Sequence, residues 1–318
     1  MVEFFGNIRV DWLGKRKIFF ALTTVLIVIG GMSLIGKKGF RYGVDFQGGT
    51  ILQVRFSEKT DIGKIRDAVP NAEIQQLLSG QNEFLMEYKG TNDAASDASQ
   101  GREAITQALN KNFPGKFEIR NAQSVGPKVG HDLRQQAVFA TLYALGGMLV
   151  YIAFRFEWIY GVVAVFAAFH DTLITLGLFS VFNREINLIV IAALLTLVGY
   201  SMNDTIVVFD RVRENLKIRR RDDLGTIMND SINQTLSRTI LTSGLTFLTV
   251  LALFIFGGEI INHFAFAMVI GIIIGTYSSI AIASPLVLIY SNLKGTFARQ
   301  PVSTAKVPNK VPKPVKAK

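Results

Sequence analysis

Residues 198–215, VGYSMNDTIVVFDRVREN, combine the apolar composition of a membrane helix with ionisable side chains. Asn203 and Asp204 stand side by side in this stretch, before the helix reaches Asp210 and Arg211. An Asp in the middle of a spanning helix costs about 2.5–3.5 kcal/mol on insertion scales, so it is usually kept to handle protons, ions or substrate. We therefore expect the rest of the chain to be organised around Asp204.

The composition indicates a multipass membrane protein. Of 318 residues, 49% are hydrophobic and 24 are Phe, and the mean hydropathy is +0.33. Apolar runs of sufficient length predict six spans, at residues 18–36, 135–154, 159–182, 187–209, 239–257 and 264–290. The first run is long and lacks a small-residue cleavage site, so we expect an uncleaved span and not a signal peptide.

The scarcity of metal-binding and nucleophilic residues excludes several classes of site. The sequence has no Cys and three His, so disulfides and thiolate chemistry are absent. We expect no metal, no cofactor and no covalent catalysis.

The distribution of Lys and Arg predicts the orientation. Basic residues cluster at 9–17, 155 and 211–221, whereas the loops at 183–185 and 258–263 contain only Arg184. The positive-inside rule then makes both termini, residues 1–17 and 291–318, cytoplasmic. The net charge of +10 reflects this topology, so specific nucleic-acid binding is not expected. We expect the basic, proline-containing tail to be disordered and to lie near anionic lipid or ribosomal RNA.

Two segments lie outside the predicted spans. Residues 37–134 contain strands at 50–56, 72–78, 83–88 and 117–125 and helices at 61–69 and 102–112, with a turn at 79–82. This β-α-β-β-α-β order predicts a ferredoxin-like α+β periplasmic domain between spans 1 and 2, a scaffold that implies no function by itself. Residues 210–238 form a cytoplasmic amphipathic loop, whose apolar residues recur at helical spacing and predict a helix on the membrane surface.

The spacing of polar residues predicts one polar stripe along the fourth span and another along the fifth. Thr196, Tyr200 and Asn203 or Asp204 recur every three or four residues, which indicates a polar path to the carboxylate. Arg238 begins a second stripe with Thr242, Thr246 and Thr249, and near Asp204 its guanidinium would favour the ionised carboxylate. Two plainer interpretations stay open: Asp204 forms an interhelical hydrogen bond, and Arg238 is a topology residue that reaches the membrane surface.

The third span carries a second carboxylate. Asp171 falls at the depth of Thr196 and Tyr200, where it either extends the polar path or serves as a structural hydrogen-bond partner. We expect its neighbour His170 to be structural, because nothing nearby supplies further metal ligands.

Glycines and one proline suggest packing and coupling. Residues 41–50, RYGVDFQGGT, resemble a phosphate loop only superficially, since no Lys-Ser/Thr follows, and a turn joining the first span to the soluble domain is favoured. In the sixth span a pair of glycines four residues apart favours close helix packing, and a proline favours a kink. The residues assigned to coupling and packing are Gly43, Asp45, Gly48, Gly49, Gly199, Gly271, Gly275 and Pro285.

The chain resembles the SecF family, the smaller membrane subunits of the bacterial SecDF protein-export complex, within the resistance-nodulation-division superfamily. Gln47 stands where the family commonly has Thr, and Met202 where it commonly has Ile. The segments that carry the resemblance are YGVDFQGG at 42–49, VGPKVGHDLR at 125–134, FHDTLITLG at 169–177, GYSMNDTIVVFDRVREN at 199–215 and GTYSSIAIASP at 275–285.

This resemblance implies a subunit of the bacterial inner membrane that uses the proton motive force to help draw secreted polypeptide out of the SecYEG channel. It implies SecD, SecYEG, YajC and the unfolded polypeptide as partners. It also implies a proton path through Asp204 and Arg238, with protons as the only coupling ion. Two alternatives remain: a proton-coupled exporter subunit for small molecules or lipids, and a membrane scaffold or insertase partner without transport activity.

Overall fold

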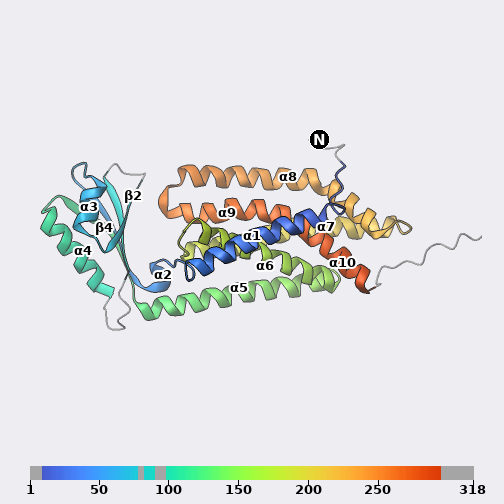
Figure 1. Cartoon of the computed structure of the whole chain (residues 1–318), viewed down its shortest axis with the longest axis horizontal. Helices are drawn as coiled ribbons and strands as arrows, with labels where there is room; N and C mark the ends of the chain where they lie inside the picture. Colours follow the sequence, from blue (N-terminus) through green and yellow to red (C-terminus); the bar gives the residue numbers. More distant parts are fainter. Residues whose placement is uncertain (1–8, 78–81, 90–97, 295–318) are drawn as a thin grey trace, which may run out of the picture.

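The computed structural model describes residues 9–77, 82–89 and 98–294. It shows a long helical bundle with a small sheet domain at one end (Figure 1). Within the described ranges, six helical segments are long and apolar enough to cross a membrane, so the predicted six-span membrane protein is confirmed. They are α1 (Arg16–Gly36), α5 (Pro127–Arg155), α6 (Trp158–Val181), α7 (Leu188–Ile218), α8 (Leu224–Phe256) and a composite of α9 (Gly258–Ser278), η1 (Ser279–Ala283) and α10 (Ser284–Lys294).

The sheet domain has the predicted β-α-β-β-α-β order. Its strands pair antiparallel in the spatial order β2-β3-β1-β4, which is the ferredoxin-like arrangement. The predicted turn at 79–82 falls largely outside the described residues. The elements are β1 (Gly49–Phe56), α3 (Ile62–Ala68), β2 (Ala72–Gln76), β3 (Glu83–Lys89), α4 (Ala98–Asn112) and β4 (Phe117–Val125).

Apolar side chains at every second residue of β1 form the core of this domain. Leu52, Val54 and Phe56 point to one face of the sheet and are almost completely buried. They pack against Ile65 of α3 and Ile105 of α4, so the two helices cover that face. The domain therefore has a hydrophobic core of its own, separate from the membrane bundle.

A junction segment, residues 41–49, fastens the sheet domain to the bundle. It contains the short helix α2 (Val44–Gln47) and contacts the α6–α7 loop: Gly43 N donates to Ile186 O at 3.0 Å, and Asp45 Oδ2 accepts from Leu188 N at 3.0 Å. Gly48 has a φ of +83°, and a Cβ there would lie 2.8 Å from Pro127 at the start of α5. The junction is thus a compact turn on which α5 and α7 also begin.

Further contacts reinforce the junction. Gly49, the first residue of β1, has a φ of +146°, a conformation that favours glycine. Arg41 Nε donates to Glu185 Oε1 at 2.8 Å, and the same guanidinium contacts Glu73 of β2. A single side chain therefore bridges the sheet domain and the α6–α7 loop.

Close glycine contacts set the spacing of the bundle helices. A Cβ at Gly271 of α9 would lie 2.5 Å from the Leu197 side chain of α7, and one at Gly275 would lie 3.0 Å from Ser201 Cβ. Where α1 crosses α6, a Cβ at Gly30 would lie 2.8 Å from the Gly177 backbone. These approaches are those of small-residue packing in membranes.

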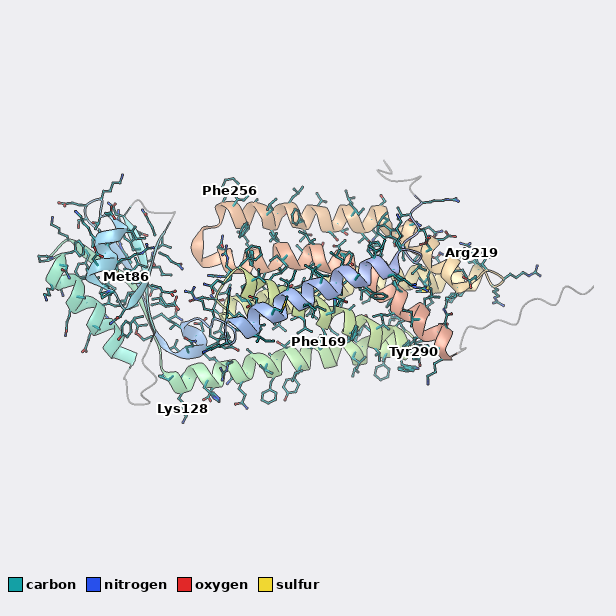
Figure 2. All side chains as sticks on the ribbon, in the orientation of Figure 1. Met86, Lys128, Phe169, Arg219, Phe256 and Tyr290 are labelled. Carbon is teal, nitrogen blue, oxygen red and sulfur yellow. The ribbon has the colours of Figure 1, made fainter. Side chains whose placement is uncertain are left out.

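The prediction that residues 210–238 form a helix on the membrane surface is wrong. α7 continues to Ile218, and α8 starts at Leu224, where the Asp223 carboxylate accepts hydrogen bonds from Gly225 N and Thr226 N. The expectation failed because the apolar stripe packs on protein and not on lipid. Its members Leu224, Ile227, Met228, Ile232 and Leu236 are all buried. In Figure 2 the tip of this hairpin, marked by Arg219, lies at the end of the molecule opposite Met86 of the sheet domain.

Pro285 follows an irregular turn in the sixth span. The π-helical segment η1 directly precedes it, and Ser284 Oγ donates to Ser279 O at 3.3 Å. A proline cannot donate the usual backbone hydrogen bond, and a π-turn with a side-chain donor accommodates that loss. The expected interruption of regular helical bonding thus takes the form of a π-bulge.

The contact between Gly30 and Gly177 gives a test of the packing. We expect Gly30→Ala to destabilise the bundle by about 1–3 kcal/mol, because the added methyl meets backbone that has no room to move aside. Thermal unfolding of the purified protein in detergent measures this loss. The matched control is Gly31→Ala, since a Cβ at Gly31 has nothing within 4 Å. Equal unfolding temperatures for the two variants would contradict the proposed close crossing.

Candidate functional site

Asp204 lies near the middle of α7 and is buried at 2% exposure. Its Oδ2 accepts a hydrogen bond from Ser243 Oγ of α8 at 2.8 Å and a longer one from Thr276 Oγ1 of α9 at 3.4 Å. Burying a carboxylate is costly unless polar partners compensate. Two hydroxyls from two neighbouring helices provide that compensation here.

Asp171 of α6 is fully buried and lies in a second polar cluster. Ser201 Oγ of α7 and Ser278 Oγ of α9 donate to its Oδ2 at 2.5 and 2.7 Å. Its Oδ1 lies 2.9 Å from His170 Nδ1, and His170 Nε2 lies 3.3 Å from Thr23 Oγ1 of α1. The cluster therefore joins four helices, and His170 forms part of it, in keeping with its expected structural role.

The two clusters are linked through α7. Ser201 contacts Asp171 and is three residues before Asp204, so both residues face the bundle interior on adjacent turns. The structure thus brings Asp171 and Asp204 into one polar interior. Asp171 reaches this interior through Ser201 and Ser278, and not through Thr196 and Tyr200 as its depth had suggested.

The polar stripe predicted along α7 is wrong in its orientation. Thr196 is exposed and donates to Ala192 O of its own helix, Asn203 is exposed, and a Cβ at Gly199 would meet nothing within 4 Å. Tyr200 is half-buried, and its hydroxyl has no hydrogen-bond partner within the described chain. The interior face instead consists of Leu197, Ser201, Asp204 and Val208, one residue further along and therefore rotated by about 100°.

Among the described residues, Asp204 and Arg238 form no direct ion pair. Arg238 is exposed, but its positive charge still acts on the Asp204 carboxylate. Arg238 lines a cavity of about 420 Å³, together with Asp210, Arg211 and Glu214 of α7. The predicted stripe on α8 faces outward as well, because Thr242 and Thr249 are exposed. We call this cavity the α7–α8 vestibule.

Hydroxyl groups that the sequence reading missed connect the vestibule to Asp204. Thr235 lines the vestibule, and Thr239 and Ser243 follow it at four-residue intervals on the buried face of α8. The Thr239 hydroxyl is buried and has no hydrogen-bond partner among the described residues, whereas Ser243 donates to Asp204. The four-residue spacing was a detectable signal, but the adjacent stripe of Arg238 and Thr242 has the same period.

The Asp171 cluster generates a stability prediction. We expect Ser278→Ala to lower stability by about 1–3 kcal/mol, because it removes one hydrogen-bond donor from a buried carboxylate. The control is Thr196→Val, which removes a hydroxyl that bonds only to its own helix on the exposed face. Thermal unfolding of both variants in detergent gives the comparison, and a loss for Thr196→Val as large as that for Ser278→Ala would contradict the assignment.

Known families match most of the chain. Residues 104–293 match the family described as "Protein export membrane protein SecD/SecF, C-terminal", and residues 33–60 match the "SecD/SecF GG Motif". The second match covers the junction segment, including Gly43, Gly48 and Gly49.

Curated relatives and solved structures agree with these matches. The chain is 47% identical to "Protein translocase subunit SecF" of Calditerrivibrio nitroreducens, over 90% of this chain and 95% of that protein. It is 42% identical to the Koribacter versatilis protein of the same name, over 92% and 95% of the two chains.

The crystal structure of SecDF from Thermus thermophilus, described as a translocon-associated membrane protein, superposes with a TM-score of 0.76 at 36% identity. The match covers 90% of this chain and 39% of that one, so the chain corresponds to less than half of SecDF. A super-membrane-facing form of SecDF gives a TM-score of 0.69 at 37% identity, over 91% and 40% of the two chains. The chain therefore belongs to the SecF family of protein translocase subunits.

Proposed function

We propose that the chain works with SecD in the Sec pathway and uses the proton motive force to complete export of polypeptides that leave the SecYEG channel. Family membership and the similarity to SecDF support the pathway. The observation that carries the proton step is Asp204, a carboxylate buried in an apolar bundle and held by hydrogen bonds from the hydroxyls of Ser243 and Thr276. An ionisable group in such a place is expected to serve proton or ion transfer.

Protonation of Asp204 changes what its neighbours must do. An ionised carboxylate accepts hydrogen bonds from both Ser243 and Thr276, whereas a protonated one also donates. When the proton is on Oδ2, which both hydroxyls contact, one hydroxyl turns to accept or its helix moves. Because Ser243 lies on α8 and Thr276 on α9, the proton alters the contact of α7 with both helices. No covalent reaction and no cofactor are needed, and the proton is the coupling ion.

The proton motive force is large enough for this role. One proton crossing a potential of 100 mV releases about 2.3 kcal/mol. That energy shifts a two-state equilibrium nearly 50-fold, which suffices to favour one arrangement of α7, α8 and α9 over another.

The proposed proton route runs along α8. The α7–α8 vestibule, with Arg238 at its edge, supplies the entrance, and Thr235, Thr239 and Ser243 lead from it to Asp204. The unpartnered Thr239 hydroxyl gives one proton or water molecule a place to bind between the other two. In this scheme Arg238 lies at the entrance beside Asp210 and Glu214, whose carboxylates attract cations.

The outward polar residues of α7 and α8 support a membrane partner. Thr196, Asn203 and Thr242 are exposed on helices whose flanking residues are apolar, and polar side chains are unfavourable against lipid. A second bundle, that of SecD, would cover them. Gly199, which has no neighbour within 4 Å, would allow a partner helix to approach α7 closely.

The topology completes the proposal. Both described ends of the chain lie at the end of the bundle opposite the sheet domain (Figure 1). Together with the positive-inside rule, this arrangement supports our proposal that the termini are cytoplasmic and the sheet domain lies in the periplasm of a bacterial inner membrane. SecYEG and YajC are the further partners that we propose, together with the unfolded secreted polypeptide and anionic lipid at the basic tail.

The central test is Asp204→Asn in vesicles that contain SecD and SecYEG. We expect proton-gradient-dependent export to fall at least tenfold while SecD binding and folding persist, because Asn keeps the hydrogen bonds but cannot ionise. The control is Asp222→Asn, an exposed carboxylate at the hairpin tip. Measurement of preprotein translocation with and without a proton gradient separates the two. Normal gradient-dependent export by Asp204→Asn would refute the proton step.

Thr239 tests the route along α8. Thr239→Val keeps the shape of the side chain but removes the hydroxyl, so we expect a severalfold lower rate of gradient-dependent export with stability unchanged or increased, because no hydrogen bond is lost. Thr106→Val, which removes a hydroxyl that donates to Arg102 O within α4 of the sheet domain, is the control and should retain the normal rate. If the two variants export at the same rate, protons reach Asp204 by another path.

A further inference from the structure

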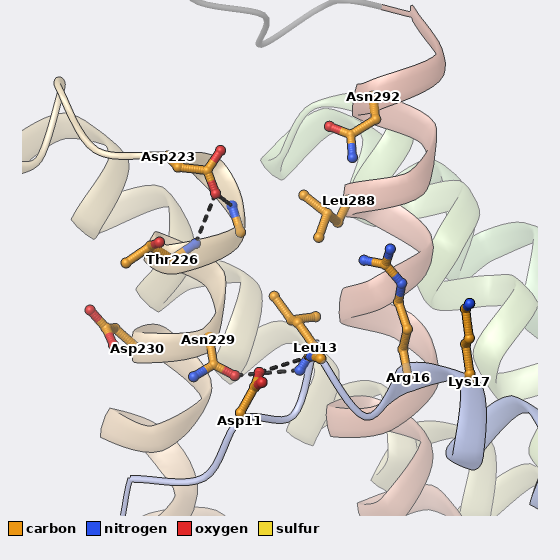
Figure 3. Close-up of a pocket in the computed structure, with 12 residues that line it drawn as sticks. Asp11, Leu13, Arg16, Lys17, Asp223, Thr226, Asn229, Asp230, Leu288 and Asn292 are labelled. Atoms are coloured by element: carbon orange, nitrogen blue, oxygen red, sulfur yellow. Dashed lines mark hydrogen bonds between the residues drawn. The ribbon is translucent and has the colours of Figure 1, made fainter.

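A second cavity lies at the hairpin end of the bundle and is separate from the proton site. It has a volume of about 530 Å³ and opens between residues 11–17, the start of α8 and the end of α10 (Figure 3). Leu13 and Leu288 lie between its two polar sides in Figure 3. None of the residues around it belongs to the α7–α8 vestibule or to the Asp171 and Asp204 clusters.

Hydrogen bonds fix the N-terminal wall of this cavity. Asn229 Oδ1 accepts from Trp12 N at 2.9 Å, and Asn229 Nδ2 donates to Val10 O at 3.0 Å. Asn233 makes a second pair of bonds to Val10 one turn further along α8. Residues 10–13 are therefore held against α8, and the cavity is part of the folded structure.

The charges of the cavity are divided between two sides. Arg16 and Lys17 lie on one side, and Asp223 and Asp230 lie on the other, at the start of α8 (Figure 3). Asp11 lines the cavity between them, and its Oδ1 accepts a hydrogen bond from Gly14 N. Asp230 pairs with Arg219, and Asp223 caps α8, whereas Arg16 and Lys17 have no ion-pair partner within the described chain. The carboxylates would repel a purely anionic ligand, and Arg16 and Lys17 would repel a purely cationic one. A ligand with one phosphate and one amine satisfies both sides.

The cavity also lies at the level where lipid headgroups are found. Lys17 directly precedes Ile18, the first residue of an apolar stripe that continues with Leu22, Val25 and Ile29 at helical spacing. These four side chains are between 42% and 66% exposed in the isolated chain. Basic residues at the start of such a stripe mark the boundary between hydrocarbon and headgroups.

We propose that this cavity binds one phosphatidylethanolamine molecule. Its phosphate contacts Arg16 and Lys17, its ammonium group donates hydrogen bonds toward Asp223 and Asp230, and its acyl chains lie along the stripe on α1. The amine must be a hydrogen-bond donor, so a choline headgroup of the same charge fits less well. This lipid would link the N-terminal segment, α8 and α10, independently of the proton step.

Binding of short-chain lipids to the purified full-length chain tests the proposal. Native mass spectrometry or tryptophan fluorescence is used with dioctanoyl phosphatidylethanolamine, phosphatidylcholine and phosphatidylglycerol, and with glycerophosphoethanolamine as the acyl-free headgroup. We expect phosphatidylethanolamine to bind at least fivefold more tightly than the other three. Equal binding of phosphatidylglycerol or phosphatidylcholine would overturn the zwitterion assignment. Equal binding of glycerophosphoethanolamine would overturn the assignment to a lipid.

Matched variants locate the site. The double variant Arg16→Gln/Lys17→Gln should lose at least tenfold in affinity, whereas Arg9→Gln/Lys15→Gln, which removes the same charge from residues outside the cavity, should stay within twofold. The exchange Arg16→Lys/Lys17→Arg should retain binding and shows that the positions tolerate substitution. Asp230→Asn should shift the preference toward phosphatidylglycerol. Equal losses in the two double variants would show attraction by overall charge and overturn the site.

Discussion

The cost of burying a carboxylate in an apolar bundle governs the arrangement of these helices. Hydroxyls from neighbouring spans and the imidazole of His170, on the same helix as Asp171, compensate Asp171 and Asp204. Thr23, Ser201, Ser243 and Ser278 therefore act as fixed points where α1, α7, α8 and α9 must meet. Close glycine contacts then allow the helices to approach near enough for these bonds to form.

The sequence was sufficient for the fold but not for the rotation of the helices. Alternation in β1 and the turn residues around it predicted the sheet domain, and continuous apolar runs predicted the spans, because both signals depend on local composition. In a membrane, however, an outward face can be as apolar as an inward one. The period that selected Thr196 and Asn203 is also that of Ser201 and Asp204. The packing of α7 against α6, α8 and α9 distinguishes the two faces.

The same ambiguity between inward and outward helix faces explains why Arg238 is exposed and not paired with Asp204. Arg238 was predicted at the start of the fifth span, but α8 begins fourteen residues earlier, at Leu224, and Arg238 is exposed. Burial of the stripe from Leu224 to Leu236 fixes that rotation. The polar residues that remain outside then define a surface suited to a second bundle. In our proposal the buried face holds the proton site, and the outward polar face contacts the partner bundle.

The junction segment gives the molecule a mechanical character. Asp45 accepts from the first backbone N–H group of α7, and Arg41 spans from the loop before that helix to β2. α7 has 31 residues, so it behaves as a rod of about 46 Å. A tilt of about 5° in such a rod displaces its end by about 4 Å. A tilt of α7 that starts beside Asp204 would thus be transmitted to the sheet domain through Asp45 and Arg41.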